Sequence, residues 1–342
     1  MAATIQEEVP VGQFTTLRVG GTARYYLRAE TIDDIRLAAA FAKKRQLPLF
    51  VLGGGSNTLV SDEGFSGMVI HVALRGKEVV KKDEDIVFYR VAAGEVLDEV
   101  IANTVIEGWW GLENLSAIPG LVGAAPVQNV GAYGVEAGSY IDDVSVFDLA
   151  TLTIKTLSQQ DCQFGYRDSL FKHESGRQYI VLAVTFRLSR TPQPNLHYKD
   201  LSEYFSSRST PPEQKQIREA IVQIRSHKFP NWNEIGTAGS FFKNPVVPRA
   251  VAEMLQTKYP ELPVYDAGLD HKKISLGYVL DKICHLKGYT NNGVALYEKQ
   301  ALVLVVREAK TANAVILFAK EITEKIFATI EVVIEWEVII MR

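Results

Sequence analysis

The stretch IPGLVGAAPVQNVGAYG, residues 118–134, is the part of the sequence that decides the fold. It combines glycines and two prolines with hardly a charge, whereas a surface loop is usually polar. We therefore expect its backbone to be buried, with N–H and C=O groups bonded to partners other than water. A planar heterocyclic cofactor would supply such partners.

A second glycine-rich stretch, VLGGGSN at residues 51–57, ends an apolar strand. Glycines adopt positive φ, and successive backbone N–H groups then converge on an anion such as a diphosphate. Taken alone, three glycines indicate only a turn that ends a strand. Neither stretch has the G-x-G-x-x-G spacing of a dinucleotide-binding Rossmann unit. Together they suggest a large nucleotide cofactor.

The rest of the sequence mixes strand and helix patterns, which indicates α/β or α+β packing. Proline pairs near residues 190–195 and 206–214 interrupt regular structure, and the main boundary is expected after the helix that follows them. Strands are expected at 67–74, 86–94, 179–188 and 301–308, helices at 33–45, 213–227, 250–259 and 278–286, and a final helix and strand at the C-terminus.

Composition excludes several classes of protein. The formal net charge of -3 predicts neither a nucleic-acid surface nor a polybasic membrane face. The start, MAATIQEEVP, has no basic and apolar regions of a secretory signal, and no apolar run reaches the ~20 residues that span a bilayer. Cys162 and Cys284 are far apart and form no zinc pattern with the histidines, so no metal is expected. We expect a cytoplasmic protein.

Six segments carry a family resemblance: TLRVGGTARY, VLGGGSN, residues 118–134, GYRDSLFK, AGSFFKNP and EKQALVLV. In this order, from about residue 14 to 338, the chain resembles the UDP-N-acetylenolpyruvoylglucosamine reductases, the MurB family, of the type with an extra tyrosine loop. The resemblance implies an α+β fold. Its FAD-binding module is of the vanillyl-alcohol-oxidase (PCMH) type in two α/β lobes, and a C-terminal α+β substrate-binding domain follows. The expected segments are the FAD-binding domain at 14–190, a connecting loop and helix at 191–227, and the substrate domain at 228–342, whose last strand packs back on the FAD module.

The resemblance also implies a reaction, that of a UDP-N-acetylmuramate dehydrogenase. NADPH reduces FAD, which transfers hydride to the enolpyruvyl C3 of UDP-N-acetylglucosamine enolpyruvate while C2 is protonated. The product, UDP-N-acetylmuramate, serves peptidoglycan synthesis. No His or Cys lies in the two glycine stretches, so we expect FAD to be bound non-covalently. We expect a monomer without nucleic-acid or membrane partners. The predicted FAD contacts are Gly53, Gly54, Gly55, Ser56, Asn57, Pro119, Gly120, Gly123, Gln128, Asn129, Gly131, Ala132, Tyr133, Gly134 and Arg225.

Hydride addition to this double bond pushes negative charge onto the substrate carboxylate, so a cation and an acid are needed. Arg167 matches the family's catalytic arginine, and a guanidinium meets a carboxylate at two points. An ion pair with Asp168 or Asp161 is the alternative. Ser240 matches the family's proton donor, and the alternative is a turn or helix cap.

Glu337 matches the third catalytic residue of the family. Glu335 lies on the same face of a strand, so an assignment shifted by two residues is a specific alternative. The predicted substrate contacts are Tyr198, Lys228, Asn244 and Gln300, and for Tyr198 packing is an equal alternative.

Two rival functions remain at this point. The first is another non-covalent FAD oxidoreductase of the same superfamily. The second is a non-catalytic UDP-sugar or flavin sensor, which would keep the glycine scaffold and lose the acid or the cation. The joint presence of Arg167, Ser240 and Glu337 favours the enzyme.

Overall fold

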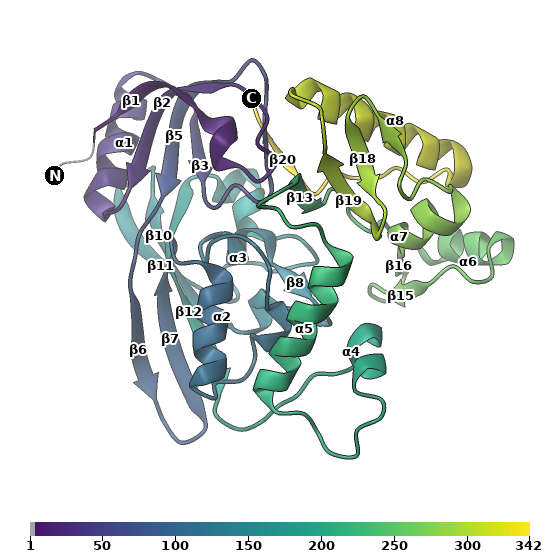
Figure 1. Cartoon of the computed structure of the whole chain (residues 1–342). Coiled ribbons are helices and arrows are strands. Elements are labelled where there is room, and N and C mark those ends of the chain that lie inside the picture. The colour runs from purple at the N-terminus through teal and green to yellow at the C-terminus, as the bar shows by residue number, and fades with distance from the viewer. Residues whose placement is uncertain (1–3) are drawn as a thin grey trace. The chain divides into compact units, whose positions relative to one another are not determined.

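The structure, a computed structural model, describes residues 4–342; the first three residues of the segment tested above for a secretory signal lie outside it. The chain forms two compact units (Figure 1). Unit 1 comprises Met1–Val9, Ala23–Gly54 and Ser66–Arg225, and unit 2 comprises Pro10–Thr22, Gly55–Phe65 and Ser226–Arg342. Each unit is therefore built from segments that are distant in sequence.

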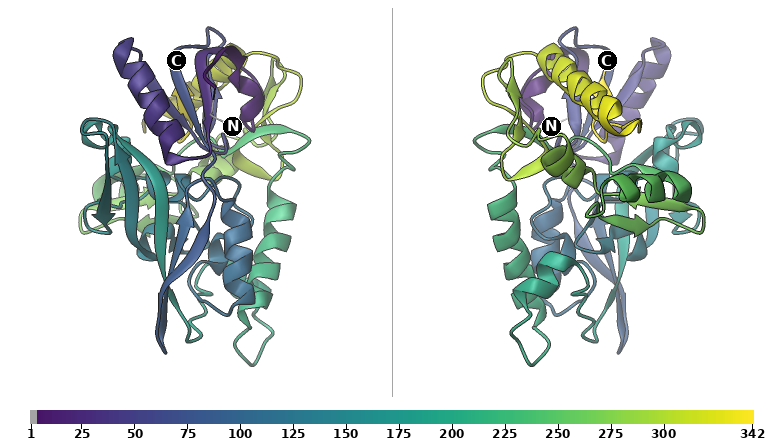
Figure 2. Two further views of the ribbon diagram at one scale, coloured as in Figure 1. Left: turned by 90° about the vertical axis from the view of Figure 1, so that its left-hand side faces the viewer. Right: turned by 90° about the vertical axis from the view of Figure 1, so that its right-hand side faces the viewer.

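The first sheet of unit 1 has four strands in the order β1-β2-β5-β3, and β3 and β5 are parallel. Helix α1 packs on this sheet through Ile35, Ala38 and Ala42 (Figure 2). Thr31 begins α1 because its hydroxyl accepts the N–H of Asp34, whose carboxylate accepts the N–H of Thr31 in return. The bounds are β1 Gln6–Pro10, β2 Thr22–Ala29, α1 Ile32–Lys44, β3 Leu49–Leu52 and β5 Phe65–Val72.

The second sheet of unit 1 is antiparallel, with five strands in the order β11-β10-β12-β7-β6. A single hydrophobic core joins both sheets and helix α2. The bounds are β6 Lys77–Lys82, β7 Ile86–Ala92, α2 Leu97–Ile106, α3 Ala124–Gln128, β8 Gly131–Ala132, β9 Val135–Glu136, β10 Ile141–Asp148, β11 Thr153–Ser158, β12 Tyr179–Ser189, α4 Lys199–Tyr204 and α5 Gln214–Lys228.

Unit 2 contains a four-stranded sheet in the order β13-β19-β18-β17, with α8 packed on β18, and a three-stranded sheet in the order β14-β16-β15. The last strand, β20, pairs in parallel with β4. The bounds are β4 Thr58–Val60, β13 Gly236–Ser240, β14 Val246–Pro248, α6 Arg249–Lys258, β15 Val264–Asp266, β16 His271–Ile274, α7 Leu276–Tyr278, the π-helix η6 Val279–Ile283, β17 Thr290–Asn291, β18 Val294–Tyr297, β19 Gln300–Val306, α8 Ala312–Ile330 and β20 Ile339–Met341. Short 3-10 helices lie at η1 Val11–Phe14, η2 Glu113–Leu115, η3 Ala137–Ser139, η4 Leu170–Lys172 and η5 Glu174–Gly176.

The strands and helices expected from hydrophobic pattern are confirmed as β5, β7, β12, β19, α1, α5, α6, α8 and β20. The helix expected at 278–286 continues from α7 into a π-helix. The prediction from sequence divided the chain into consecutive domains, whereas the compact units are built from interleaved segments. Strand β20, for example, pairs with β4, which precedes it by more than half the chain. The loop and helix expected to connect the domains contribute α4 and most of α5 to unit 1. The predicted functional boundaries stay a prediction.

Candidate active site

In unit 1 the two glycine stretches meet at Gly54 and Gly120. Strand β3 ends at Leu52, and a Cβ added to the next residue, Gly53, would find no atom within 4 Å. At Gly54 an added Cβ would lie 3.1 Å from the Cα of Gly120, which itself has a positive φ of +122°. Side chains are therefore excluded where the backbones approach, and space is left beside Gly53.

The backbone of residues 117–123 is bonded largely by the protein itself. Leu97 N–H donates to Gly120 O at 3.1 Å, and the N–H groups of Val122 and Gly123 donate to Glu95 O and Ala93 O, both at 2.9 Å. These backbone groups have protein partners, as expected, but only Val122 of residues 117–123 is buried and the others are half-buried. Part of the role first given to a cofactor is played by neighbouring backbone.

Ala117, at the start of this stretch, has φ +59° and is fixed at both of its backbone groups. Its N–H donates to Asp98 Oδ1 at 2.6 Å, and its C=O accepts Arg225 Nε at 3.2 Å. Arg218 binds both oxygens of Asp98 at 2.6 and 2.9 Å. Asp98 and Arg218 were not predicted, because nothing local in the sequence connects two side chains 120 residues apart.

Helix α3 ends at Asn129, which has left-handed backbone angles and a side chain only 2% exposed. Its Nδ2 donates to Glu136 Oε2 at 2.9 Å and to Gly165 O at 2.8 Å, and its Oδ1 accepts the N–H of Gly138 at 2.9 Å. The side chain thus links the glycine segment to the turn at Gly165. A contact of Asn129 with a cofactor stays a prediction.

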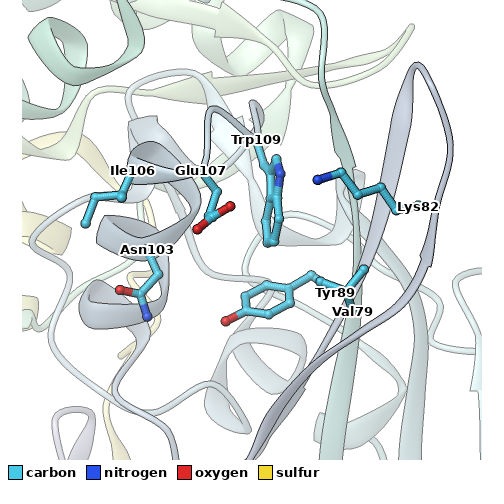
Figure 3. Close-up of a pocket in the computed structure, with 7 residues that line it drawn as sticks. All are labelled: Val79, Lys82, Tyr89, Asn103, Ile106, Glu107 and Trp109. Carbon is cyan, nitrogen blue, oxygen red and sulfur yellow. The ribbon is translucent and has the colours of Figure 1, made fainter.

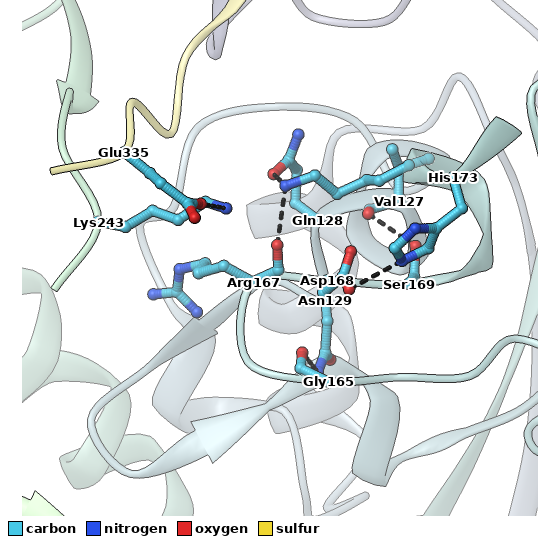
Figure 4. Close-up of polar contacts among 11 residues, drawn as sticks. Val127, Gln128, Asn129, Gly165, Arg167, Asp168, Ser169, His173, Lys243 and Glu335 are labelled. Atoms are coloured by element: carbon cyan, nitrogen blue, oxygen red, sulfur yellow. Dashed lines mark hydrogen bonds and ion pairs between the residues drawn. The ribbon is translucent and has the colours of Figure 1, made fainter. Parts of the chain in front are cut away.

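Arg167 lies at the tip of that turn with φ +53°. Gly165 and Asp168 exchange backbone hydrogen bonds of 3.0 and 3.1 Å, and Lys172 Nζ donates to Arg167 O at 2.8 Å (Figure 4). The guanidinium Nη2 donates to Gly131 O at 2.6 Å, and an added Cβ at Gly131 would lie 2.8 Å from Nη1. The predicted catalytic cation therefore rests on the predicted cofactor segment.

The two carboxylates considered as alternative partners of Arg167 have other partners. Asp168 Oδ2 bonds His173 Nε2 at 2.9 Å (Figure 4). Asp161 Oδ2 accepts the hydroxyl and the N–H of Ser158 at 2.7 and 2.9 Å, and these bonds lower the pKa of Asp161.

Tyr133 and Gly134 form the two-residue turn between β8 and β9, with φ of +48° and +79°. The Tyr133 ring meets that of Tyr198 edge-on at 5.2 Å. Burial raises the pKa of Tyr133 to about 12, and the nearby Arg225 opposes this rise. Burial also lowers the pKa of Arg225, while Tyr133 acts in the opposite sense. Arg225 is thus bonded to Tyr133 and the Ala117 backbone, and Tyr198 is 45% exposed beside them.

In unit 2, Ser240 ends β13 opposite Val303 of β19 and is half-buried. Asn244 Oδ1 accepts the N–H of Leu276 at 2.9 Å at the start of α7. Gln300 begins β19, and its Oε1 would lie 3.4 Å from a Cβ added at Gly277. Lys228 is the last residue of α5. Gly55 has a φ of +63°, and a Cβ added to it would lie only 2.2 Å from Phe14 O.

The two glutamates near the C-terminus have different surroundings. Glu335 is an exposed partner of Lys243, with Nζ 2.8 Å from Oε2 (Figure 4). Glu337 is half-buried, its N–H donates to Phe241 O at 2.8 Å, and its C=O accepts Asn57 Nδ2 at 3.0 Å. Glu335 is exposed and paired with Lys243, whereas Glu337 is half-buried, so the surroundings favour Glu337 as the candidate catalytic glutamate. Lys243 is the partner of Glu335 in this ion pair and not of Glu337.

A hollow elsewhere on unit 1 contains none of the predicted site residues. It lies between α2 and the β6–β7 hairpin (Figure 3), and Val79, Lys82, Tyr89, Asn103, Ile106, Glu107 and Trp109 line it. Within residues 4–342, no three His, Cys, Asp or Glu side chains gather in a group that would hold a metal ion. No helix in this part of the chain is long and apolar enough to cross a membrane.

Comparison with known proteins gives the family. A family model for an FAD-binding domain matches residues 23–158, and one for the C-terminal domain of UDP-N-acetylenolpyruvoylglucosamine reductase matches residues 230–341. The chain is 39% identical over 321 residues to the UDP-N-acetylenolpyruvoylglucosamine reductase of Neisseria meningitidis serogroup A, covering 93% of this chain and 92% of the relative. The chain belongs to the UDP-N-acetylenolpyruvoylglucosamine reductase family.

Comparisons with two other reductases of this family support the same assignment. The reductase of Ralstonia nicotianae is 38% identical over 343 residues, covering 99% of this chain and 100% of the relative. The crystal structure of the reductase from Thermus caldophilus shares the fold, with a TM-score of 0.71 at 23% identity over 100% of both chains. The predicted family and the fold, an FAD-binding module followed by a C-terminal α+β domain, are confirmed. The rival functions receive no support.

Proposed function

We propose that this chain catalyses the NADPH-dependent reduction of UDP-N-acetylglucosamine enolpyruvate to UDP-N-acetylmuramate, with FAD as cofactor. The observation that carries the proposal is the contact of Arg167 with Gly131, which attaches the predicted carboxylate-binding cation to the predicted flavin-binding segment. The family membership supplies the reaction class.

The residues of unit 1 fit a large planar cofactor. Gly53 leaves open space where a side chain would project, and the contact between Gly54 and Gly120 tolerates no bulk. The holding residues would be the glycines and neighbouring positions named in the sequence analysis, in unit 1 and, for Gly55, Ser56 and Asn57, in unit 2. Bound FAD supplies hydride transfer from NADPH to the enolpyruvyl C3, which no amino-acid side chain can perform.

Arg167 would bind the substrate carboxylate and offset the charge that develops there as C3 gains hydride. The planar guanidinium presents a fork of N–H donors that matches the two oxygens of a carboxylate. The turn that fixes its backbone, and Gly131 O at 2.6 Å, limit the positions it can adopt. Arg167 is thereby preorganised to receive an anion.

Ser240 would deliver the proton to C2, so that one hydride and one proton together saturate the double bond. Glu337 would hydrogen-bond the charged intermediate. Tyr198, Lys228, Asn244 and Gln300 would contact the nucleotide sugar, with Arg225 and Lys228 as cations for phosphate. We propose further that the enzyme is a monomer in the cytoplasm.

Stopped-flow absorbance of the Ser240→Ala variant tests the assignment. NADPH should bleach the yellow flavin at nearly the wild-type rate, since Ser240 takes no part in that half-reaction. Recolouring by UDP-N-acetylglucosamine enolpyruvate should slow by about 100-fold or more, the usual size of a lost general acid. Ser206→Ala, at an exposed hydroxyl, is the matched control. A protein without flavin contradicts the proposed function. Unchanged recolouring removes Ser240 from it.

A further inference from the structure

Strand β13 carries a β-bulge immediately before Ser240. The strand pairs in register with β19 at Gly236–Val306 and Thr237–Val305, and pairing resumes at Ser240–Val303. Three steps along β13 therefore correspond to two steps along β19, which leaves one extra residue in β13. Gly239 takes the positive φ of +71° that such a bulge requires, and no atom lies within 4 Å of an added Cβ.

The bulge decides which face of the sheet Ser240 occupies. In a regular ladder continuing from Thr237–Val305, Ser240 would pair with Leu302, whose side chain packs against the main hydrophobic core of unit 2. With the extra residue it pairs with Val303, which belongs with Val305 to a separate, smaller cluster. A shift of one residue would thus move the hydroxyl to the opposite face.

The side chain of Thr237 holds this bulge. Its Oγ1 donates to Leu304 O at 2.8 Å and accepts the N–H of Gly239 at 3.1 Å. The N–H of Gly239 lies where the ladder is interrupted, so the hydroxyl substitutes for the missing strand partner. Thr237 is itself 5% exposed, and its N–H donates to Thr16 O at 3.0 Å. After the bulge, Phe241 N–H donates to Leu302 O at 2.9 Å and the ladder continues.

We propose that Thr237 is a positioning residue for the reductase reaction: its hydroxyl maintains the bulge that aims Ser240 at the substrate. The inference rests on the proposed role of Ser240 as proton donor. Thr237 would act through Ser240 and not on the substrate directly. The role of Thr237 could not be predicted from the sequence, because threonine is a common residue in strands.

Thr237→Val and Thr237→Ser test the proposal as a pair. Valine keeps the shape and loses both hydrogen bonds, whereas serine keeps the hydroxyl. In Thr237→Val, recolouring of the flavin by substrate should slow at least tenfold, equivalent to ~1.4 kcal/mol of barrier, while bleaching by NADPH stays within about twofold. Thr237→Ser should recover most of the lost rate. Equal slowing of both half-reactions in Thr237→Val would indicate general damage and overturn the proposal.

A double variant separates this inference from the proposed function. If Thr237 acts only through Ser240, Thr237→Val in a Ser240→Ala background should slow recolouring no further, whereas independent effects would multiply. Should Ser240→Ala alone have no effect, the proposed role of Ser240 fails and the inference fails with it. Should Ser240→Ala slow the reaction and Thr237→Val not, the inference alone fails.

Gly239→Ala provides a second route if Thr237→Val does not fold. The added methyl meets no atom within 4 Å, so its effect comes from the positive φ, which is unfavourable for alanine. The bulge should relax, and recolouring should slow while bleaching does not. Gly239→Asn, which tolerates this conformation, should be affected less. Equal rates in both variants would contradict the proposal.

Discussion

Asp98→Ala should loosen the start of the glycine segment and weaken FAD binding. Asp98 is the point where three hydrogen bonds meet, from the Ala117 N–H and from both terminal nitrogens of Arg218. Ala117 has φ +59°, which costs a residue with a Cβ about 1–2 kcal/mol. Without the hydrogen bond to Asp98, Ala117 should relax to a more favourable backbone conformation.

The size of the expected loss in stability depends on how far Arg218 and Asp98 are exposed to solvent. Hydrogen bonds to charged groups contribute about 1.5–3 kcal/mol each, but the side chains of Arg218 and Asp98 are 19% and 33% exposed, so solvent screening reduces the sum. A loss of about 2–3 kcal/mol lowers the melting temperature of a unit of this size by about 4–12 °C. Fixing the backbone of Ala117 again on binding costs about 1–2 kcal/mol, which raises the Kd for FAD by about 5- to 30-fold.

The assays are calorimetry of the FAD-free protein and fluorescence titration with FAD. Glu99→Ala is the matched control, because Glu99 lies in the same first turn of α2 and shares its interaction with the helix dipole. Burial raises the pKa of Asp98, but hydrogen bonds from Arg218 and Ala117 outweigh it, so the pKa lies below the ordinary 3.8. The contribution of Asp98 is therefore complete above pH 3.8 and is lost as the pH falls through its lower folded pKa. Asp98→Ala matching Glu99→Ala in both assays at pH 7 would refute this reasoning.

Three further predictions concern single substitutions. Gly131→Ala places a Cβ 2.8 Å from Nη1 of Arg167, so the guanidinium must move; stopped-flow should show recolouring by substrate slowed about tenfold or more, with bleaching by NADPH preserved. Burial raises the pKa of Glu113. The stability that Glu113 contributes is therefore complete below pH 4.5 and is lost as the pH rises through its folded pKa. The melting temperature of Glu113→Gln relative to wild type should rise from pH 4.5 to 8, and a constant difference would contradict this. Glu335→Gln breaks an exposed ion pair and should change the free energy of unfolding by less than about 1 kcal/mol without loss of turnover. Glu337→Gln should abolish turnover. The reverse result would assign the catalytic role to Glu335 in place of Glu337.

Local pattern in the sequence was enough for most elements and for the glycine segments. The alternation and apolar runs at β5, β7 and β12 reflect burial on one or both faces of a sheet, which any register preserves. The close approach of Gly54 and Gly120 agrees with the interpretation of both stretches as parts of one cofactor site. These features are visible because each is encoded in consecutive residues.

Long-range partners could not be predicted in this way. The parallel pair β4–β20 joins residues near 58 and 339, and no property of either strand specifies the other. The interleaving of the two units follows from that pairing and from the docking of residues 10–22 with the second half of the chain. The bulge at Gly239 was also hidden, because its signal, one extra residue, appears only against the register of β19.

The predicted site segments of unit 1 share a feature that explains both what was found and what was missed. Ala117, Asn129, Tyr133 and Arg167 all have positive φ, although none is glycine. Such backbone costs energy and persists only where surrounding contacts impose it. Asp98 and Lys172 hold the backbones of Ala117 and Arg167, Asn114 Nδ2 donates to Tyr133 O at 2.9 Å, and Asn129 uses its own amide. A segment with a strained backbone requires an unusual amino-acid composition, and the glycine-rich, nearly uncharged residues 118–134 show this composition in the sequence. The residues that impose the strain need only one donor or acceptor each, which any asparagine, aspartate or lysine offers. The segments are therefore recognisable from sequence, and the residues that hold them become recognisable only in the folded chain.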